Sequence, residues 1–286
     1  MSAGTEQETE ERAYVYMVRC AGGQLYTGWT NDPGARLHAH KTGRGAKATR
    51  AMGAERFAYL ERCADRSAAL RREAALKKLP KAKKEALCAG WEEKNLPRLS
   101  VASRADAKDI LELYNWYVLH HTATFQVTPS TLEEYEDWVD NTLKVAPLLL
   151  ARDADGRLLG YACAHRWHPR EAYDWSVEST IYCAPDARGC GVGTLLYRAL
   201  LELLTACGYW NVYALVADPN PASERIHEQL GFSCVGRPPH TAYKFGWLGL
   251  STWWLALRTG NEKPAPVRMV TAEQTQAVLS KYGKTE

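Results

Sequence analysis

The pattern of apolar and polar positions near the start of the chain predicts a small α/β unit. Two short runs rich in β-branched and aromatic residues, "AYVYMVRC" and "QLYTGWT", are separated by "AGG", which is typical of a hairpin. A helix follows in "NDPGARLHAHKTG", with Asp32 as its N-cap, Pro33 at its first position and Gly43 at its end. A third strand, "RFAYLERC", and a second helix from about Ser67 complete the pattern. These elements predict a three-stranded sheet with helices.

A second β-α pattern begins at Leu99 with the strand "RLSVASR". Helices are expected over 106–120 and 131–143, and strands in "PLLLARD", "LLGYACAHRW" and "WSVESTIYC". A glycine-rich loop, an apolar helix and the strand "NVYALVA" come next. A helix over 222–230 and a pair of strands around 232–258 end the pattern. Together with a length of 286 residues, this predicts two domains.

Changes in composition set the expected boundaries. The start of the chain, "MSAGTEQETEE", has nothing to bury and is expected to be disordered, and "AGWEEKNLPR" is interpreted as a linker. Near the end, Thr271 and Gln274 have the spacing of a capping box, which predicts a short terminal helix. The expected segments are a leader over 1–12, a first domain over 13–88, a linker over 89–98, a second domain over 99–260 and a tail over 261–286.

Charge is distributed unevenly between the two halves. Residues 1–98 contain 19 lysines and arginines against 12 acidic residues, a net charge of +7, whereas residues 99–286 carry −4. A basic first domain is what a phosphate-binding surface would require. The alternative is a solvated, lysine-rich helix in "LKKLPKAKKEAL", which would account for part of the same excess.

Cysteine usage and hydropathy bear on the compartment. The eight cysteines form no C-x-x-C pair and no zinc-ligand spacing, and no apolar run near the start resembles a signal peptide. We expect reduced thiols in a cytoplasmic protein. No uncharged apolar stretch reaches the roughly 18 residues of a membrane span, so no membrane partner is expected.

The glycine-rich stretch "APDARGCGVGTLLYRALLELL" predicts an anion site. A helix N-terminus preceded by glycines presents backbone N–H groups and the positive end of the helix dipole to an anion. The stretch lacks the Lys-Ser/Thr pair of a P-loop and the spacing of a Rossmann fingerprint. Cys190 stands in this loop without a basic partner, so a nucleophilic role is not expected for it.

This loop, with "NPASERIHEQLGF" downstream, resembles the Gcn5-related N-acetyltransferases (GNAT). The resemblance implies a mixed, mostly antiparallel sheet flanked by helices, with acetyl-CoA as the acetyl donor. Its pyrophosphate would lie on the loop, and backbone N–H groups near Tyr182 to Ala184 would polarise the thioester carbonyl. The cofactor-binding residues implied are Tyr182, Cys183, Arg188, Gly189, Gly191, Gly193 and Asn220.

Within that family, "YNWYVLHHTATFQ", "HPREAYDWSVESTIYC" and "HTAYKFGWLG" resemble the subgroup that acetylates phosphinothricin and methionine sulfoximine, over nearly all of 99–258. The resemblance implies Glu178 as the base that takes the ammonium proton, and His227 as the acid in place of a tyrosine. The alternatives are a surface carboxylate at Glu178 and a hydrogen-bonded core histidine at His227. A protein or polyamine acceptor also stays open.

The same resemblance implies the acceptor contacts. Relatives carry an arginine pair at alternate positions in the loop "RWHPREAYDW", where this chain has His168 and Arg170. These side chains would hold the anionic groups of a small amino acid, with Phe125 as an apolar wall. A solvated loop is the alternative. The family also implies a homodimer formed through the acetyltransferase domain.

The first half, from "YVYMVRC" through "QLYTGWTNDPGARLHAHKTG", resembles the stand-alone GIY-YIG nuclease module over residues 13–88. Tyr14 replaces the leading glycine of the motif, and Glu85 lies where some relatives have an asparagine. The resemblance implies hydrolysis of a DNA phosphodiester and a divalent cation such as Mg²⁺. The residues implied are Tyr16 and His40 as base, with Tyr26, Arg36 on the phosphoryl oxygens, and Glu73 as the metal ligand. A module that binds nucleic acid without cleaving it stays open.

Overall fold

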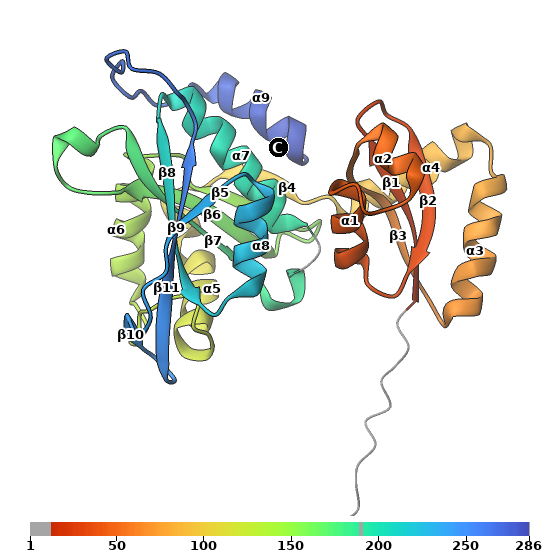
Figure 1. Cartoon of the computed structure of the whole chain (residues 1–286), viewed down its shortest axis with the longest axis horizontal. Helices are drawn as coiled ribbons and strands as arrows, with labels where there is room; N and C mark the ends of the chain where they lie inside the picture. Colours follow the sequence, from red (N-terminus) through yellow and green to blue (C-terminus); the bar gives the residue numbers. More distant parts are fainter. Residues whose placement is uncertain (1–12, 189–190, 286) are drawn as a thin grey trace, which may run out of the picture. The chain divides into compact units, whose positions relative to one another are not determined.

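The structure, a computed structural model, describes residues 13–188 and 191–285 (Figure 1). The chain divides between Leu96 and Pro97 into two compact units, each of which has its own sheet. Within the described ranges, no helix is both long and apolar enough to cross a bilayer.

The N-terminal unit has a three-stranded antiparallel sheet in the order β2-β1-β3. Its buried core includes Val15, Met17, Ala58 and Leu76. The predicted three-stranded sheet with helices is confirmed. Its strands are β1 (Ala13–Cys20), β2 (Leu25–Thr30) and β3 (Ala54–Cys63), and its helices are α1 (Pro33–Lys41), α2 (Lys47–Met52), α3 (Arg66–Lys78) and α4 (Lys81–Asn95).

Helix α1 begins as its sequence predicts. The Asp32 carboxylate accepts a hydrogen bond from the Ala35 N–H at 2.9 Å, and Pro33 occupies the first helical turn. Helix α2, by contrast, was not expected from the sequence.

Helix α4 runs through most of the segment expected to be a linker, residues 89–98. Cys88 is buried and Trp91 packs against the core of the unit, so the helix is held by tertiary contacts. It ends before Pro97, because a proline disfavours helical geometry in the residue that precedes it.

The C-terminal unit is built on a mixed sheet in the order β10-β11-β8-β7-β6-β5-β4, with β9 added to β11. Among the named strands of the described residues, β7 and β8 are the one parallel pair, which confirms the predicted mixed, mostly antiparallel sheet. The strands are β4 (Arg98–Val101), β5 (Leu149–Arg152), β6 (Leu158–Arg166), β7 (Ser176–Cys183), β8 (Asn211–Asp218), β9 (Ser233–Gly236), β10 (Ala242–Tyr243) and β11 (Trp247–Ala256).

Helices cover both faces of this sheet (Figure 1). Side chains alternate along a strand, so Tyr161 and Cys163 of β6 pack with α5 (Ala107–His120) and α6 (Leu132–Leu143). Ala162 and Ala164 of the same strand belong to the opposite core, with α7 (Val192–Cys207). Helix α8 (Pro221–Gln229) packs against that second core through Ile226.

The C-terminal segment closes one edge of the sheet. Helix α9 (Ala272–Tyr282) begins with a capping box between Thr271 and Gln274 and packs on α7. Beyond it, the Lys284 carbonyl accepts a hydrogen bond from the Leu99 N–H at 2.7 Å. The tail is therefore part of the folded C-terminal unit.

We predict that Leu279→Ala destabilises the C-terminal unit. The leucine side chain is 2% exposed in the core shared with α7, so truncation leaves a cavity and costs about 2 to 5 kcal/mol. Denaturant unfolding followed by far-UV circular dichroism measures the change. The neighbouring exposed Ser280→Ala is the control, and equal stability of the two variants would contradict the packing of α9.

Candidate functional sites

A cavity opens where β7 and β8 separate. The two strands pair only through Ser176–Glu178 and Asn211–Tyr213, and beyond these residues they diverge. The cavity has a volume of about 360 Å³. Its lining includes Ile181, Tyr182 and Cys183 from β7, Ala214, Leu215, Val216 and Ala217 from β8, and Asn220 and His227 from α8.

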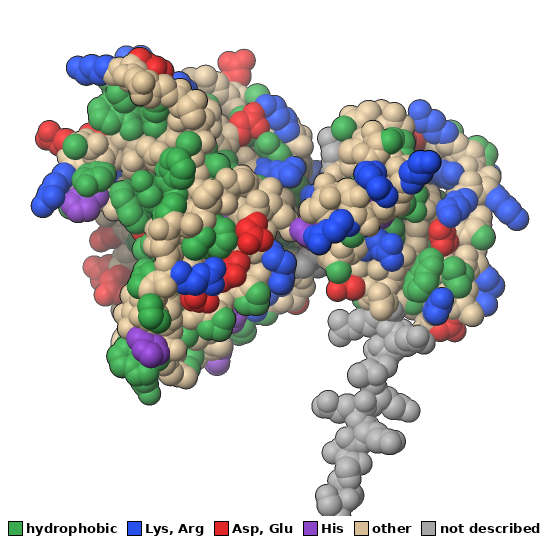
Figure 2. All heavy atoms as spheres, in the orientation of Figure 1, with side chains coloured by type: hydrophobic (Ala, Val, Ile, Leu, Met, Phe, Trp, Pro, Cys, Tyr) green, Lys and Arg blue, Asp and Glu red, His purple; other side chains and the backbone are tan. Residues whose placement is uncertain are grey.

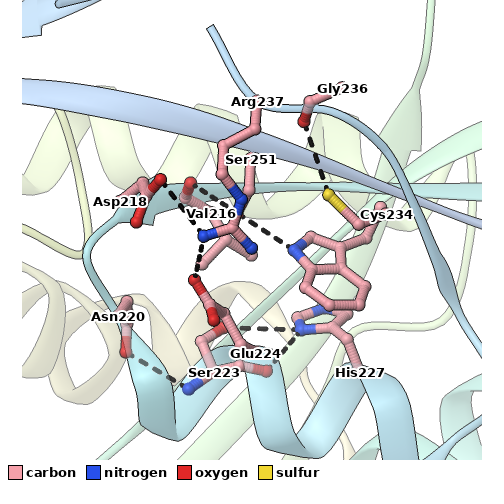
Figure 3. A network of polar contacts seen from close by, with 11 residues as sticks. Val216, Asp218, Asn220, Ser223, Glu224, His227, Cys234, Gly236, Arg237 and Ser251 are labelled. Atoms are coloured by element: carbon pink, nitrogen blue, oxygen red, sulfur yellow. Dashed lines mark hydrogen bonds and ion pairs between the residues drawn. The ribbon is translucent and has the colours of Figure 1, made fainter. Parts of the chain in front are cut away.

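Helix α8 is fixed against the open end of β8 (Figure 3). The Asn220 side-chain oxygen caps the helix by accepting from the Ser223 N–H at 3.2 Å. Arg237 bridges Asp218 at the end of β8 and Glu224 of α8, at 3.2 and 3.0 Å. These contacts tie α8 to the end of β8, so the part of the cavity wall that α8 forms is held in place.

The glycine-rich loop borders the same cavity. The Arg188 guanidinium lies 5.2 and 5.1 Å from the ring centroids of Trp116 and Tyr117, which positions its charge. Gly191 has a φ of +91°, a conformation that favours glycine, and a Cβ at Gly193 would stand 3.3 Å from the Cys183 sulfur. Of the predicted loop residues, Gly189 lies outside the described residues, as does Cys190.

The backbone of β7 offers donors to this cavity. The Ala184 N–H bonds the Leu159 carbonyl of β6 at 2.8 Å. Because N–H groups alternate in direction along a strand, those of Ile181 and Cys183 point to the β8 side. Of the expected residues Tyr182 to Ala184, Cys183 has its N–H group on the β8 side, and the register adds Ile181 to it.

Glu178 lines the cavity at the point where the strands part. Its carboxylate is 22% exposed and lies 3.6 Å from the Nε2 atom of His165, its cross-strand neighbour on β6. Phe125 lines the same cavity. The structure therefore brings together Glu178, Phe125 and five of the predicted cofactor-binding residues, namely Tyr182, Cys183, Arg188, Gly193 and Asn220. The sequence did not single out His165, because only the β6–β7 register places it beside Glu178.

His168 and Arg170 lie elsewhere. Both are on the loop between β6 and β7, and among the described residues that line the cavity neither is present. The loop is anchored by Trp167, whose ring stacks on Tyr213 with centroids 4.2 Å apart. Arg170 is exposed. Their contact with an acceptor therefore stays a prediction.

His227 is buried in the cavity wall with both ring nitrogens engaged. Its Nδ1 atom lies 2.7 Å from the Ser223 carbonyl, which can only accept, so Nδ1 carries the proton. Its Nε2 atom then accepts from the Tyr197 hydroxyl at 2.9 Å. Burial lowers the pKa of His227 to about 4, so the ring is neutral at pH 7. This geometry favours a positioning role over the expected role as acid.

In the N-terminal unit, the predicted residues gather around a buried tyrosine. The Tyr16 hydroxyl lies 2.7 Å from the Nε2 atom of His40, and the Tyr26 ring packs against both side chains. Glycines make room for this pair. A Cβ at Gly28 would stand 2.5 Å from the Tyr16 hydroxyl, and one at Gly45 would stand 2.4 Å from the Nδ1 atom of His40. The packing of Tyr16 thus explains why position 28 is a glycine.

Charged groups surround Tyr16. Burial raises its pKa far above the usual value; the neighbouring Tyr26 and Glu73 also raise this pKa, and the Arg36 charge lowers it. Glu73 has a side chain that is 14% exposed and is ion-paired with Lys77 at 2.6 Å. Among the described residues there is no cluster of three or more metal-ligating side chains.

Glu85, which replaces the asparagine of some relatives, belongs to a separate contact. Both of its carboxylate oxygens accept hydrogen bonds from Arg19 at 2.9 Å. It joins α4 to β1 and is not part of the group around Tyr16.

Comparisons with known proteins find a family match in each of the two units. The acetyltransferase (GNAT) family matches residues 110–232, and the GIY-YIG catalytic domain family matches residues 12–86. Phosphinothricin N-acetyltransferase of Streptomyces coelicolor is 40% identical over 144 residues, which are 49% of this chain and 84% of that protein. An L-methionine sulfoximine/L-methionine sulfone acetyltransferase of Pseudomonas aeruginosa is 37% identical over 165 residues, covering 57% of this chain and 96% of that one.

A solved structure shows the same fold with a cofactor. The phosphinothricin acetyltransferase of Sinorhizobium meliloti in complex with acetyl-CoA superposes with a TM-score of 0.58 and 33% identity, covering 59% of this chain and 94% of that one. The chain therefore belongs to the GNAT acetyltransferase family, among relatives of the phosphinothricin and methionine sulfoximine type, and carries a GIY-YIG domain ahead of the acetyltransferase unit.

Proposed function

We propose that the C-terminal unit transfers the acetyl group of acetyl-CoA to the α-amine of a small amino acid or analogue of the phosphinothricin and methionine sulfoximine class. The observation that carries this proposal is the position of Glu178, whose carboxylate lines the cavity opened by β7 and β8. The acceptors named for the relatives support the class of substrate.

The residues present fit acetyl-CoA, which supplies an activated acetyl group when bound. Arg188 and the N-terminus of α7 would attract its pyrophosphate. The N–H groups of Ile181 and Cys183 would stabilise negative charge on the thioester oxygen. Glu178 would take a proton from the acceptor ammonium, leaving a neutral amine. As the new C–N bond forms and the C–S bond breaks, the second proton of the amine nitrogen would pass to the departing CoA thiolate.

The anionic groups of the acceptor need a positively charged partner. We assign that contact to His168 and Arg170, as the sequence predicts. Arg170 carries a permanent charge, and the exposed loop lies between the two strands that hold Glu178 and His165.

We predict that Glu178→Gln lowers kcat/KM for methionine sulfoximine about 100-fold or more at pH 7, the usual contribution of a general base. Raising the pH restores part of the rate, since more acceptor amine is then already neutral. Release of the CoA thiol measures both effects. The exposed Glu112→Gln on α5 is the matched control, and wild-type rates in Glu178→Gln at every pH would place the base elsewhere.

We also propose that the N-terminal unit binds nucleic acid and hydrolyses phosphodiesters. The observation that carries this second function is the hydrogen-bonded series Tyr16–His40–Thr49. The Thr49 hydroxyl donates to the Ala46 carbonyl at 2.9 Å, so its oxygen accepts from the Nδ1–H of His40 at 2.7 Å. Burial and the nearby Arg36 charge lower the pKa of His40 and favour its neutral form.

With Nδ1 protonated, the Nε2 atom of neutral His40 accepts a hydrogen bond from the Tyr16 hydroxyl. Tyr16 can then take a proton from an attacking water while passing its own to His40. Glu73 is the residue that would hold Mg²⁺, an ion that keeps several waters and can be bound through one carboxylate. The Lys77 ion pair occupies that carboxylate in the structure, so the cation would compete with it.

We predict that Thr49→Val destroys the single tautomer of His40. Valine has the size of threonine but cannot accept from Nδ1–H, so the proton is no longer held there. Imidazole ¹⁵N chemical shifts should show Nδ1–H alone in the wild type and in Thr49→Ser, and a mixture in Thr49→Val. A pure Nδ1–H form in Thr49→Val would contradict the assignment.

We predict that Glu73→Ala abolishes cleavage of DNA but leaves the binding of DNA unchanged. Exposed Arg36, Arg44, Lys47 and Arg50 lie on or beside α1 and α2, and Figure 2 shows several Lys and Arg side chains spread over the visible face of this unit. Affinity should fall steeply as salt rises, equally in the wild type and the variant, whereas cleavage of branched or nicked DNA should require Mg²⁺ and vanish in the variant. Salt-sensitive binding without cleavage by the wild type would establish a binding module instead.

A further inference from the structure

A second cavity adjoins the first on the other side of β7. It has a volume of about 370 Å³ and lies between the helices α5 and α6 and the strands β6 and β7. Thr180 and Tyr182 line both cavities, so the two meet along this strand. The His165–Glu178 pair spans the same boundary, with His165 in the second cavity and Glu178 in the first.

Aromatic rings make up half of the second cavity's wall. Trp138 and Tyr135 of α6 pack with centroids 4.7 Å apart, and Tyr135 in turn contacts Tyr114 of α5 at 5.4 Å. Tyr161 and Tyr182 pack at 5.5 Å on the sheet side. These contacts fix the rings in place, so the cavity presents a rigid aromatic surface to an occupant.

The second cavity has one carboxylate among its described lining residues and no permanent positive charge. Glu134 of α6 contributes a carboxylate, and among the described residues that line the cavity there is no lysine or arginine. Gln126 is already engaged, because its amide donates to the Thr128 carbonyl at 2.7 Å and its oxygen accepts from Tyr114 at 2.9 Å. An anionic phosphinate or carboxylate would therefore find no counter-charge here, whereas aromatic rings and a carboxylate attract an organic cation.

The spacing of residues along β7 sets the side-chain length that an acceptor needs in order to reach the second cavity. Glu178 and Thr180 stand two residues apart on one face of the strand, and this separation is about 7 Å. An α-amine beside Glu178 with a side chain of four or five atoms would thus place the end of that side chain in the second cavity. The α-carboxylate would stay at the exposed loop that carries Arg170.

We propose that the second cavity binds the cationic end of the acceptor's side chain, so that the unit acetylates the α-amine of amino acids with an ammonium or quaternary ammonium group. This inference rests on the proposed acetyl transfer at Glu178 and names a substrate class beyond the neutral or anionic side chains of the relatives' acceptors.

The test compares three acceptors of similar length that differ in the charge of the side-chain end. They are Nε-trimethyl-L-lysine, its neutral carbon isostere with a tert-butyl end, and L-2-aminoadipate, each with the α-amine as the only acetylation site. We expect kcat/KM for the cation to exceed that for the isostere about tenfold, with aminoadipate lower still. A preference for aminoadipate, or equal rates for the cation and its isostere, overturns the proposal.

Two variants assign the preference to the cavity. Glu134→Gln keeps a side-chain oxygen for the Thr131 N–H at the start of α6 and removes the charge, and Trp138→Leu removes one ring. Each variant should lower kcat/KM for the trimethyl-lysine about threefold or more. Glu134→Gln should leave kcat/KM for the isostere unchanged. The exposed Glu133→Gln is the control, and unaltered ratios in both variants contradict the proposal.

A direct binding measurement separates this proposal from the acetyl transfer on which it rests. Calorimetric titration with Nε-trimethyl-L-lysine should detect binding to the full chain that is weaker in Glu134→Gln and Trp138→Leu. Such binding without thiol release from any acceptor, methionine sulfoximine included, would refute the proposed function and leave the cation site standing. Thiol release with methionine sulfoximine but no binding of the trimethyl-lysine would refute the cation site alone.

Discussion

The acetyltransferase unit depends on the short parallel pairing of β7 and β8. Three residues of each strand are paired, and beyond Glu178 and Tyr213 the strands diverge. In a continuous sheet the backbone groups of β7 would be used on both sides, and no cavity could form between neighbouring strands about 4.8 Å apart. The opening exposes the β8-facing N–H groups of Ile181 and Cys183 and places Glu178 at its inner end. The backbone N–H groups that would bind the cofactor and the candidate base Glu178 therefore both depend on one interruption of the sheet.

In the N-terminal unit the corresponding constraint is the burial of Tyr16 against His40. Neither Gly28 nor Gly45 could carry a side chain without displacing one of these two rings. Thr49 then completes the arrangement by accepting from the ring of His40 and donating to a backbone carbonyl. The unit thus encloses the His40 ring with both of its nitrogens hydrogen-bonded. Because the Thr49 hydroxyl donates to the Ala46 carbonyl, its oxygen accepts from Nδ1–H of His40, and Nε2 is left to accept from Tyr16.

The sequence predicted the elements whose determinants are local. The start of α1 follows from Asp32 and Pro33, and the strands from runs of β-branched and aromatic residues. It did not predict α4 through residues 89–95, because that helix is held by Cys88 and Trp91 against a core formed by distant strands. In the site, the residue types were predictable from the motifs, but the donor pair on β7 and the position of His165 depend on strand register, which no local pattern specifies.

We expect acetyl-CoA to bind in the opening between β7 and β8. Amide hydrogen exchange of the full chain, with and without acetyl-CoA, would detect this binding at the backbone groups that the cofactor protects. Bound acetyl-CoA should slow exchange at Ile181 and Cys183 and in the first turn of α7, and leave exchange in β1 to β3 unchanged. Unchanged exchange at Ile181 and Cys183 at saturating acetyl-CoA would contradict this binding.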